Sequence, residues 1–225
     1  MNRFLSIFFI LMLSLSAPLM ASGMQYESLW KNCLKQHSKT KRFAFMKIKA
    51  VDYKNLAKSQ SFYALPNSLN LLRFNRLSKQ QQTVYLINSF NIGVVSHYMR
   101  YPNQPLSLSQ KIPFMSSGHS FEEVIKQLKK QNPSLLLTLC TADIRSPQLR
   151  AYSSQNFDKE FNSQKQRFIK RSIHIIDSEH KLKVFPWYKQ MGISKDIILK
   201  QYLGKTNSNN YELSYTPHKW QLNSL

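Results

Sequence analysis

Covalent chemistry in this 225-residue chain would need a cysteine or serine nucleophile and a histidine base. Cys140 ends a short apolar run, and Ser146 follows shortly after it. A thiolate or an activated hydroxyl needs a base within hydrogen-bond reach, and a histidine from elsewhere in the chain, such as His119, could supply it. One hypothesis is therefore a thiol or serine hydrolase, or an acyl-transferase-like enzyme.

Both cysteines lie in apolar surroundings. Cys33 shares a helical stripe with Trp30 and Leu34, and Cys140 closes the run that begins at Leu135. Three interpretations stay open: two buried free thiols, a Cys33–Cys140 disulfide, and a nucleophilic cysteine. The last needs an electropositive and partly exposed setting, whereas a disulfide needs an oxidising compartment.

Two asparagines stand one turn apart in an apolar helical pattern. Asn88 and Asn91 have poor helix propensity, and a buried amide must be hydrogen-bonded. Either they tie neighbouring loops to the helix through backbone bonds, or they hold a ligand or orient a histidine. Both alternatives predict that replacing them is costly.

No cofactor or metal signature is present. Five glycines are too few and too scattered for a phosphate-binding loop of the Walker or dinucleotide type. The six histidines do not pair at metal-ligand spacing. We therefore predict neither a cofactor nor a metal.

The chain is strongly basic, with 32 lysines and arginines against 11 acidic residues and a formal net charge of +21. Two predicted helices carry basic residues on their outer faces: Lys126, Lys129 and Lys130, then Lys165, Arg167, Lys170 and Arg171. Such a surface predicts an anionic envelope polymer, a lipid headgroup or a partner protein, or it serves only solubility. The aromatic residues fall mostly on predicted core stripes, which argues against nucleic-acid binding.

Residues 1–21 have the pattern of a secretory signal peptide: a short positive start, an apolar run and a small-residue exit near Ala21. Cleavage would leave residues 22–225 exported to the periplasm or the outside, without an integral membrane domain. An uncleaved segment, anchoring the protein at its N-terminus, is the alternative.

The elements that position these residues belong to one α+β domain. Helices are expected near 26–37, over 79–98, after the capping box of Ser120 and Glu123, and around 157–171. Leu135–Cys140 is expected as a covered strand, 173–176 and 181–185 as a hairpin, 194–203 as a helix and 211–215 as a strand. The helix over 79–98 is apolar nearly all round, so we expect it to run through the core beside a small, mostly antiparallel sheet.

Four short motifs in this order carry a family resemblance: Val51–Tyr53, Leu86–Asn91, Trp187–Tyr188 and Trp220–Asn223. The chain resembles the "domain of unknown function 547" family over about residues 26–223. The resemblance implies a segment with His, Cys and Cys-Pro positions, from which this chain departs. A gapless match places Ser134 at the family's Arg, Leu136 at its His, Thr141 at its first Cys and Ser146 at the Cys before Pro, while His218 and Lys219 replace Tyr-Asp.

A one-residue slip would return Cys140 to a cysteine position of the family, but no slip restores the histidine. We therefore expect a diverged, non-catalytic member that binds an acidic envelope component or a partner protein through its basic surface. The hydrolase and nucleic-acid binding are the alternatives.

Overall fold

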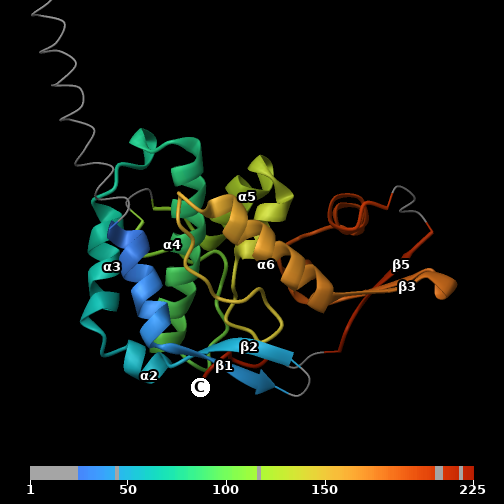
Figure 1. Cartoon of the computed structure of the whole chain (residues 1–225), viewed down its shortest axis with the longest axis horizontal. Helices are drawn as coiled ribbons and strands as arrows, with labels where there is room; N and C mark the ends of the chain where they lie inside the picture. Colours follow the sequence, from blue (N-terminus) through green and yellow to red (C-terminus); the bar gives the residue numbers. More distant parts are fainter. Residues whose placement is uncertain (1–24, 44–45, 116–117, 206–209, 218–219) are drawn as a thin grey trace, which may run out of the picture.

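A computed structural model describes residues 25–43, 46–115, 118–205, 210–217 and 220–225. Its central element is α4 (Lys79–Arg100), which begins at a capping box between Ser78 and Gln81 and is buried over most of its length. Apolar side chains on nearly every face explain this burial. Figure 1 shows α4 in green beside a helix over 25–36 and α3 (Gln60–Asn70). The expected central helix is confirmed.

Further helices surround α4. The second capping box, Ser120 with Glu123, begins α5 (Phe121–Gln131), whose apolar face packs inward. The long amphipathic α6 (Phe157–Ser172) buries Phe157, Gln164 and Phe168. The shorter helical elements are α2 (Tyr53–Leu56), η1 (Phe74–Arg76), η2 (Pro133–Thr138), η3 (Asp177–Glu179), α7 (Trp187–Gln190) and the π-helical η4 (Ile197–Tyr202).

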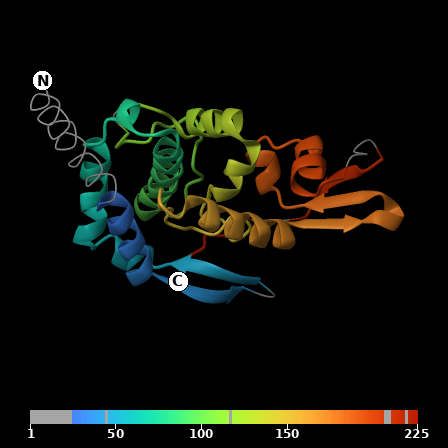
Figure 2. The same cartoon turned by 45° about the horizontal axis from the view of Figure 1, so that its top comes forward.

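Two small sheets complete the α+β domain. The antiparallel pair β1 (Ser38–Phe43) and β2 (Met46–Val51) lies along the lower side of the molecule in Figure 2, below α6. The second sheet lies at the right-hand end and contains β3 (Ile173–Ile176), β4 (Lys181–Val184) and β5 (Glu212–Tyr215). The expected hairpin is confirmed as β3 and β4, paired antiparallel across η3. The last strand, β5, pairs parallel to β4. Two of the three strand pairs in the described residues are antiparallel, as expected for a mostly antiparallel arrangement.

The prediction of a strand over Leu135–Cys140 was wrong. The run forms the 3-10 helix η2, which starts at Pro133 and is capped by the Asn132 side chain accepting a bond from Ser134 N at 2.9 Å. It packs against α5, α6 and η4, and its three leucines are buried. A continuous apolar run indicates burial on all sides, and burial alone does not distinguish a strand from a helical turn.

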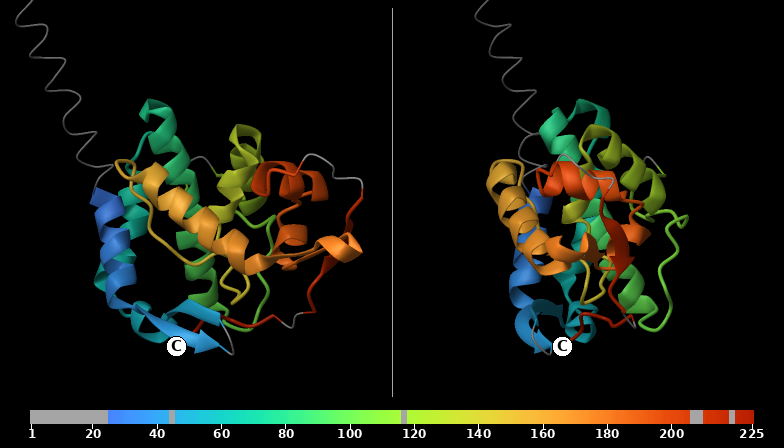
Figure 3. Two further views of the ribbon diagram at one scale, coloured as in Figure 1. Left: turned by 45° about the vertical axis from the view of Figure 1, so that its right-hand side comes forward. Right: turned by 90° about the vertical axis from the view of Figure 1, so that its right-hand side faces the viewer.

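A C-terminal tail, residues 220–225, connects β2 to the segment after η2. Asn223 N donates to Ala142 O at 2.8 Å, and Asn223 O accepts from Val51 N at 2.8 Å. Trp220 stacks on Tyr98 of α4, with ring centroids 5.4 Å apart. Figure 3 shows this end of the chain beside β1 and β2.

None of the helices in the described ranges combines the length and apolar character that crossing a bilayer requires. The predicted signal peptide, residues 1–21, lies outside the described residues, as do His218 and Lys219.

Candidate functional site

The two nucleophile candidates do lie together. Cys140 Sγ is 3.6 Å from Ser146 Oγ, and the Ser146 hydroxyl donates to Asp143 O at 2.8 Å. The same hydroxyl accepts from Thr141 N at 3.2 Å. Cys140 is fully buried and Ser146 is 2% exposed, so both side chains are parts of a packed turn.

This pair lacks the partners that would activate it. Among the described residues, the hydrogen-bond partners of Cys140 and Ser146 include no histidine. Burial raises the pKa of the Cys140 thiol, because desolvation disfavours the thiolate. His119 bonds the Gln127 amide at 2.6 Å and lines a different, open hollow beside Arg73. The structure therefore does not assemble a nucleophile and base from Cys140, Ser146 and His119.

Cys33 and Cys140 are both free thiols and both buried. Of the three arrangements that the sequence leaves open, the structure has the buried free thiols. Burial also raises the pKa of the Cys33 thiol, which makes it a poor nucleophile.

The two asparagines of α4 hold the segment that follows η2. Asn88 Nδ2 donates to Tyr152 O at 2.8 Å, and its Oδ1 accepts from Tyr152 N at 3.0 Å. Asn91 does the same for Thr138 O at 3.1 Å and Cys140 N at 2.9 Å. Each amide thus bonds one backbone N–H and one backbone carbonyl of the neighbouring segment. Of the two roles considered for the asparagines, this is the tying of loops to the helix.

The predicted basic surface divides into groups with different environments. On α5, Lys126 pairs with Glu122 at 3.0 Å, Lys129 donates to Gly192 O at 2.6 Å, and Lys130 is exposed. On α6, Arg167 and Lys170 are exposed, while Lys165 is half-buried.

Arg171 departs from the expectation that it lies on the outer face of α6. Its Nη2 donates to Ser146 O at 2.6 Å, and its guanidinium lies 5.5 Å from the centre of the Phe168 ring. Positions three apart share a helix face, so Arg171 stands at the edge of the buried stripe that includes Phe168. Burial lowers its pKa.

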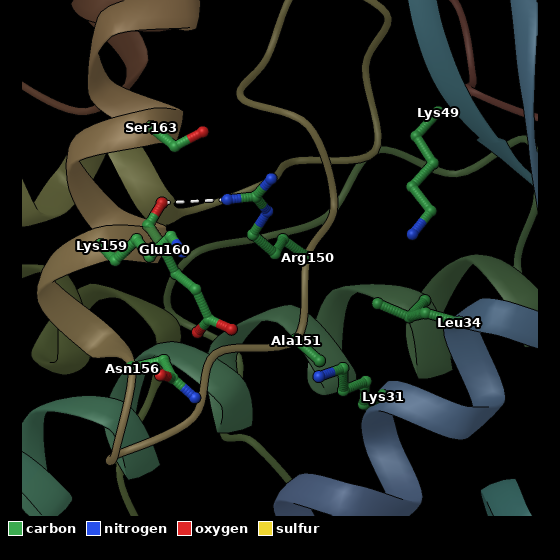
Figure 4. A pocket seen from close by; sticks show the side chains of 9 residues that line it. All are labelled: Lys31, Leu34, Lys49, Arg150, Ala151, Asn156, Lys159, Glu160 and Ser163. Carbon is green, nitrogen blue, oxygen red and sulfur yellow. Dashed lines mark hydrogen bonds between the residues drawn. The ribbon is translucent and has the colours of Figure 1, made fainter.

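Another depression lies between the helix over 25–36, β2, residues 150–151 and α6. We call it the basic cleft; its volume is about 540 Å³, and its lining residues are Lys31, Leu34, Lys49, Arg150, Ala151, Asn156, Lys159, Glu160 and Ser163. Figure 4 shows the lysines of the N-terminal helix and β2 on one side, the α6 residues on the other, and Arg150 between them.

In the described residues, no cation of the basic cleft forms an ion pair, although Glu160 is among the lining residues. Arg150 Nη1 donates to the Glu160 backbone carbonyl at 3.0 Å, while the Glu160 carboxylate accepts from Ser153 N at 2.8 Å. Lys49 is half-buried, and burial together with Arg150 lowers its pKa. Within the described ranges, the ion pairs lie elsewhere, at Lys126, Lys181 and Lys205.

A second depression adjoins the basic cleft along α6. We call it the Arg171 hollow; its volume is about 200 Å³, and it is lined by Lys47, Gln148, Gln164, Arg167, Phe168 and Arg171. Two glutamine amides fix its frame, because Gln148 Nε2 donates to Lys47 O at 3.1 Å and Gln164 Nε2 donates to Gln148 O at 3.1 Å.

Sequence reasoning missed the strand and loop residues of both depressions. Lys47 and Lys49 alternate with buried Met46 and Ile48 in β2, which was the one available signal. Arg150 follows an irregular segment and shows no pattern that would have marked it.

Within the described part of the chain, no three His, Cys, Asp or Glu side chains gather closely enough to hold a metal ion. Comparison with family models finds no match, and comparisons with curated proteins and with solved structures find none either.

Proposed function

We propose that this protein is a non-catalytic binding protein that holds an anionic polymer in the basic cleft. The observation that carries the proposal is the group of cations from three separate elements, Lys31, Lys49 and Arg150, that face one depression without a carboxylate ion pair. Lys31 is exposed, but Lys49 and Arg150 are half-buried, and desolvated positive charge is costly unless an anion compensates it. An anionic ligand would supply that compensation.

A thin polymer fits these cations better than a membrane surface does. Lys49 and Arg150 are half-buried, and the cleft that they line is recessed between β2 and α6. A planar array of headgroups meets projecting side chains first, whereas a flexible chain can enter a recess. The buried and unactivated Cys140 supports a binding role over catalysis.

Two further parts of the proposed function concern the protein's location and its family relationship. We infer from the signal-peptide pattern of residues 1–21 that the protein acts after export, where anionic envelope polymers are available. We also propose that it is a diverged relative of the "domain of unknown function 547" family. The loss of that family's histidine agrees with a role in binding.

The test is the binding of fluorescently labelled linear polyphosphate, followed by anisotropy at two salt concentrations. Neutralising about four phosphates would weaken binding roughly 50-fold between 50 and 200 mM salt. Binding that is absent, or insensitive to salt, would overturn the proposal. Stronger binding to anionic vesicles than to polyphosphate would overturn the choice of a polymer.

A pair of matched variants locates the site. Lys31→Gln with Lys49→Gln removes two charges from the basic cleft, and we expect at least a tenfold loss of affinity. Lys165→Gln with Lys170→Gln removes the same charge from α6 outside the residues that line the cleft, and we expect less than a threefold loss. Equal losses in the two variants would mean that overall charge, not the basic cleft, governs binding.

A further inference from the structure

Three cations converge on the Arg171 hollow from two elements. Lys47 projects from β2, while Arg167 and Arg171 lie one turn apart on α6. No aspartate or glutamate is among the residues that line the hollow. The hollow is therefore a second concentration of positive charge, distinct from the basic cleft.

The guanidinium of Arg171 has hydrogen-bonding capacity that the fold does not use. Nη2 donates to Ser146 O at 2.6 Å, but the buried Nε donates no hydrogen bond within the described structure. Its packing against Phe168 and its bond to Ser146 hold the planar group in one orientation. A pre-oriented guanidinium is well suited to oxyanion recognition, because it loses little freedom per bond formed.

Size and charge limit what this hollow can accept. The volume of about 200 Å³ is below the usual range for pockets that hold whole small-molecule ligands, and it is roughly seven times the volume that one water occupies in the liquid. It can hold one anionic group with a few attached atoms. A phosphate group is anionic and presents its oxygens in several directions, which matches three converging cations better than a planar carboxylate does.

We propose that the Arg171 hollow is a subsite for a single phosphate group of the polymer bound in the adjacent basic cleft. This inference rests on the proposed function and adds the chemical class of the ligand. The hollow and the basic cleft lie side by side along β2, because Lys47 lines one and Lys49 lines the other. The two residues are on one face of the strand, about 7 Å apart. Gln148 lines the hollow and Arg150 lines the cleft, and Gln148 Nε2 bonds Lys47 O, so this segment also borders both depressions.

The test is a titration with inorganic phosphate, followed by the ¹⁵N–¹H signals of arginine Nε in the full chain. Arg171→Lys, which removes one signal, assigns the Arg171 resonance. We expect a saturable shift of that signal with phosphate and a shift at least fivefold smaller with acetate at equal concentration. No shift with phosphate, or equal shifts with both anions, would overturn the inference.

Two further variants separate this inference from the proposed function. Lys47→Gln with Arg167→Gln alters exposed side chains, so the fold should persist; we expect it to weaken phosphate binding at least tenfold. Lys31→Gln with Lys49→Gln should leave phosphate binding within twofold. If polyphosphate binding depends on the basic cleft but phosphate does not shift the Arg171 signal, only the subsite proposal is overturned. A phosphate shift at Arg171 without polyphosphate binding would overturn the proposed function.

Discussion

Replacing Asn91 with alanine should cost about 3 kcal/mol of unfolding free energy. The change removes two buried bonds and leaves Cys140 N and Thr138 O without their side-chain partner. Each buried backbone group left unpaired costs about 1–3 kcal/mol. The higher helix propensity of alanine returns only about 0.5 kcal/mol. Since domains are stable by about 5–15 kcal/mol, this loss is large.

Urea unfolding followed by circular dichroism measures this effect. With an m-value of about 2 kcal/mol/M, a loss of about 3 kcal/mol lowers the midpoint by about 1.5 M. Gln80→Ala, on the exposed side of the same helix, is the matched control and should change stability by less than about 0.5 kcal/mol. Loosening the segment after η2 should also speed the labelling of Cys140.

An Asn91→Ala midpoint that coincides with that of Gln80→Ala would contradict this prediction. In that case the two amide bonds do not hold the segment. An unchanged midpoint together with lost polyphosphate binding would instead favour the ligand-holding alternative for the asparagines.

Three other outcomes follow from the packing. Native protein at neutral pH should show almost no thiol labelling within minutes, and both cysteines should react in urea; rapid labelling of the native chain would contradict the burial of Cys33 and Cys140. Buried tyrosines should make stability depend on pH, because burial raises their pKa in the folded protein while they ionise normally once unfolded. Stability should be fully present below pH 9 and should fall as pH rises past 10, by about 1.4 kcal/mol per pH unit for each buried tyrosine. Urea midpoints at pH 8, 10 and 11 check this, and a flat profile would exclude it; the tyrosines concerned are Tyr26, Tyr53, Tyr152, Tyr188 and Tyr202. Gly93→Val should cost about 1–3 kcal/mol, since even a Cβ at that position would lie 2.9 Å from Phe121 Cζ, and an unchanged melting temperature would show that α4 and α5 can separate.

Local signals in the sequence were sufficient for α4, α5, α6 and the β3–β4 hairpin, but α3 and the β1–β2 pair were not predicted. The capping boxes at Ser78 and Ser120 mark helix starts through contacts between residues three apart, so they are readable without any tertiary information. The β3 and β4 hairpin is likewise a short-range structure. The strand prediction for Leu135–Cys140 was wrong because neighbouring elements decide between a strand and a helical turn here. The sequence alone does not reveal which elements those are.

The candidate site was less accessible to prediction. Cys140 and Ser146 are close because few residues separate them, and that proximity could be anticipated. The basic cleft instead joins Lys31, Lys49 and Arg150, whose encounter depends on how the helix over 25–36, β2 and α6 pack. A sequence pattern reports one element at a time, so it marked the outer face of α6 and missed the depression beside it.

The tail over 220–225 also constrains the order in which the chain can fold. The Tyr53 hydroxyl bonds the Asn223 side chain at 2.7 Å across 170 residues of sequence. Closing a flexible loop of that length has an entropic cost on the order of 4–5 kcal/mol, so this contact is expected to form late on the folding pathway. Until it forms, Val51 N and Ala142 O lack their partners in the tail. Docking of the tail therefore pairs backbone groups of two segments, β2 and the turn after η2, in one step.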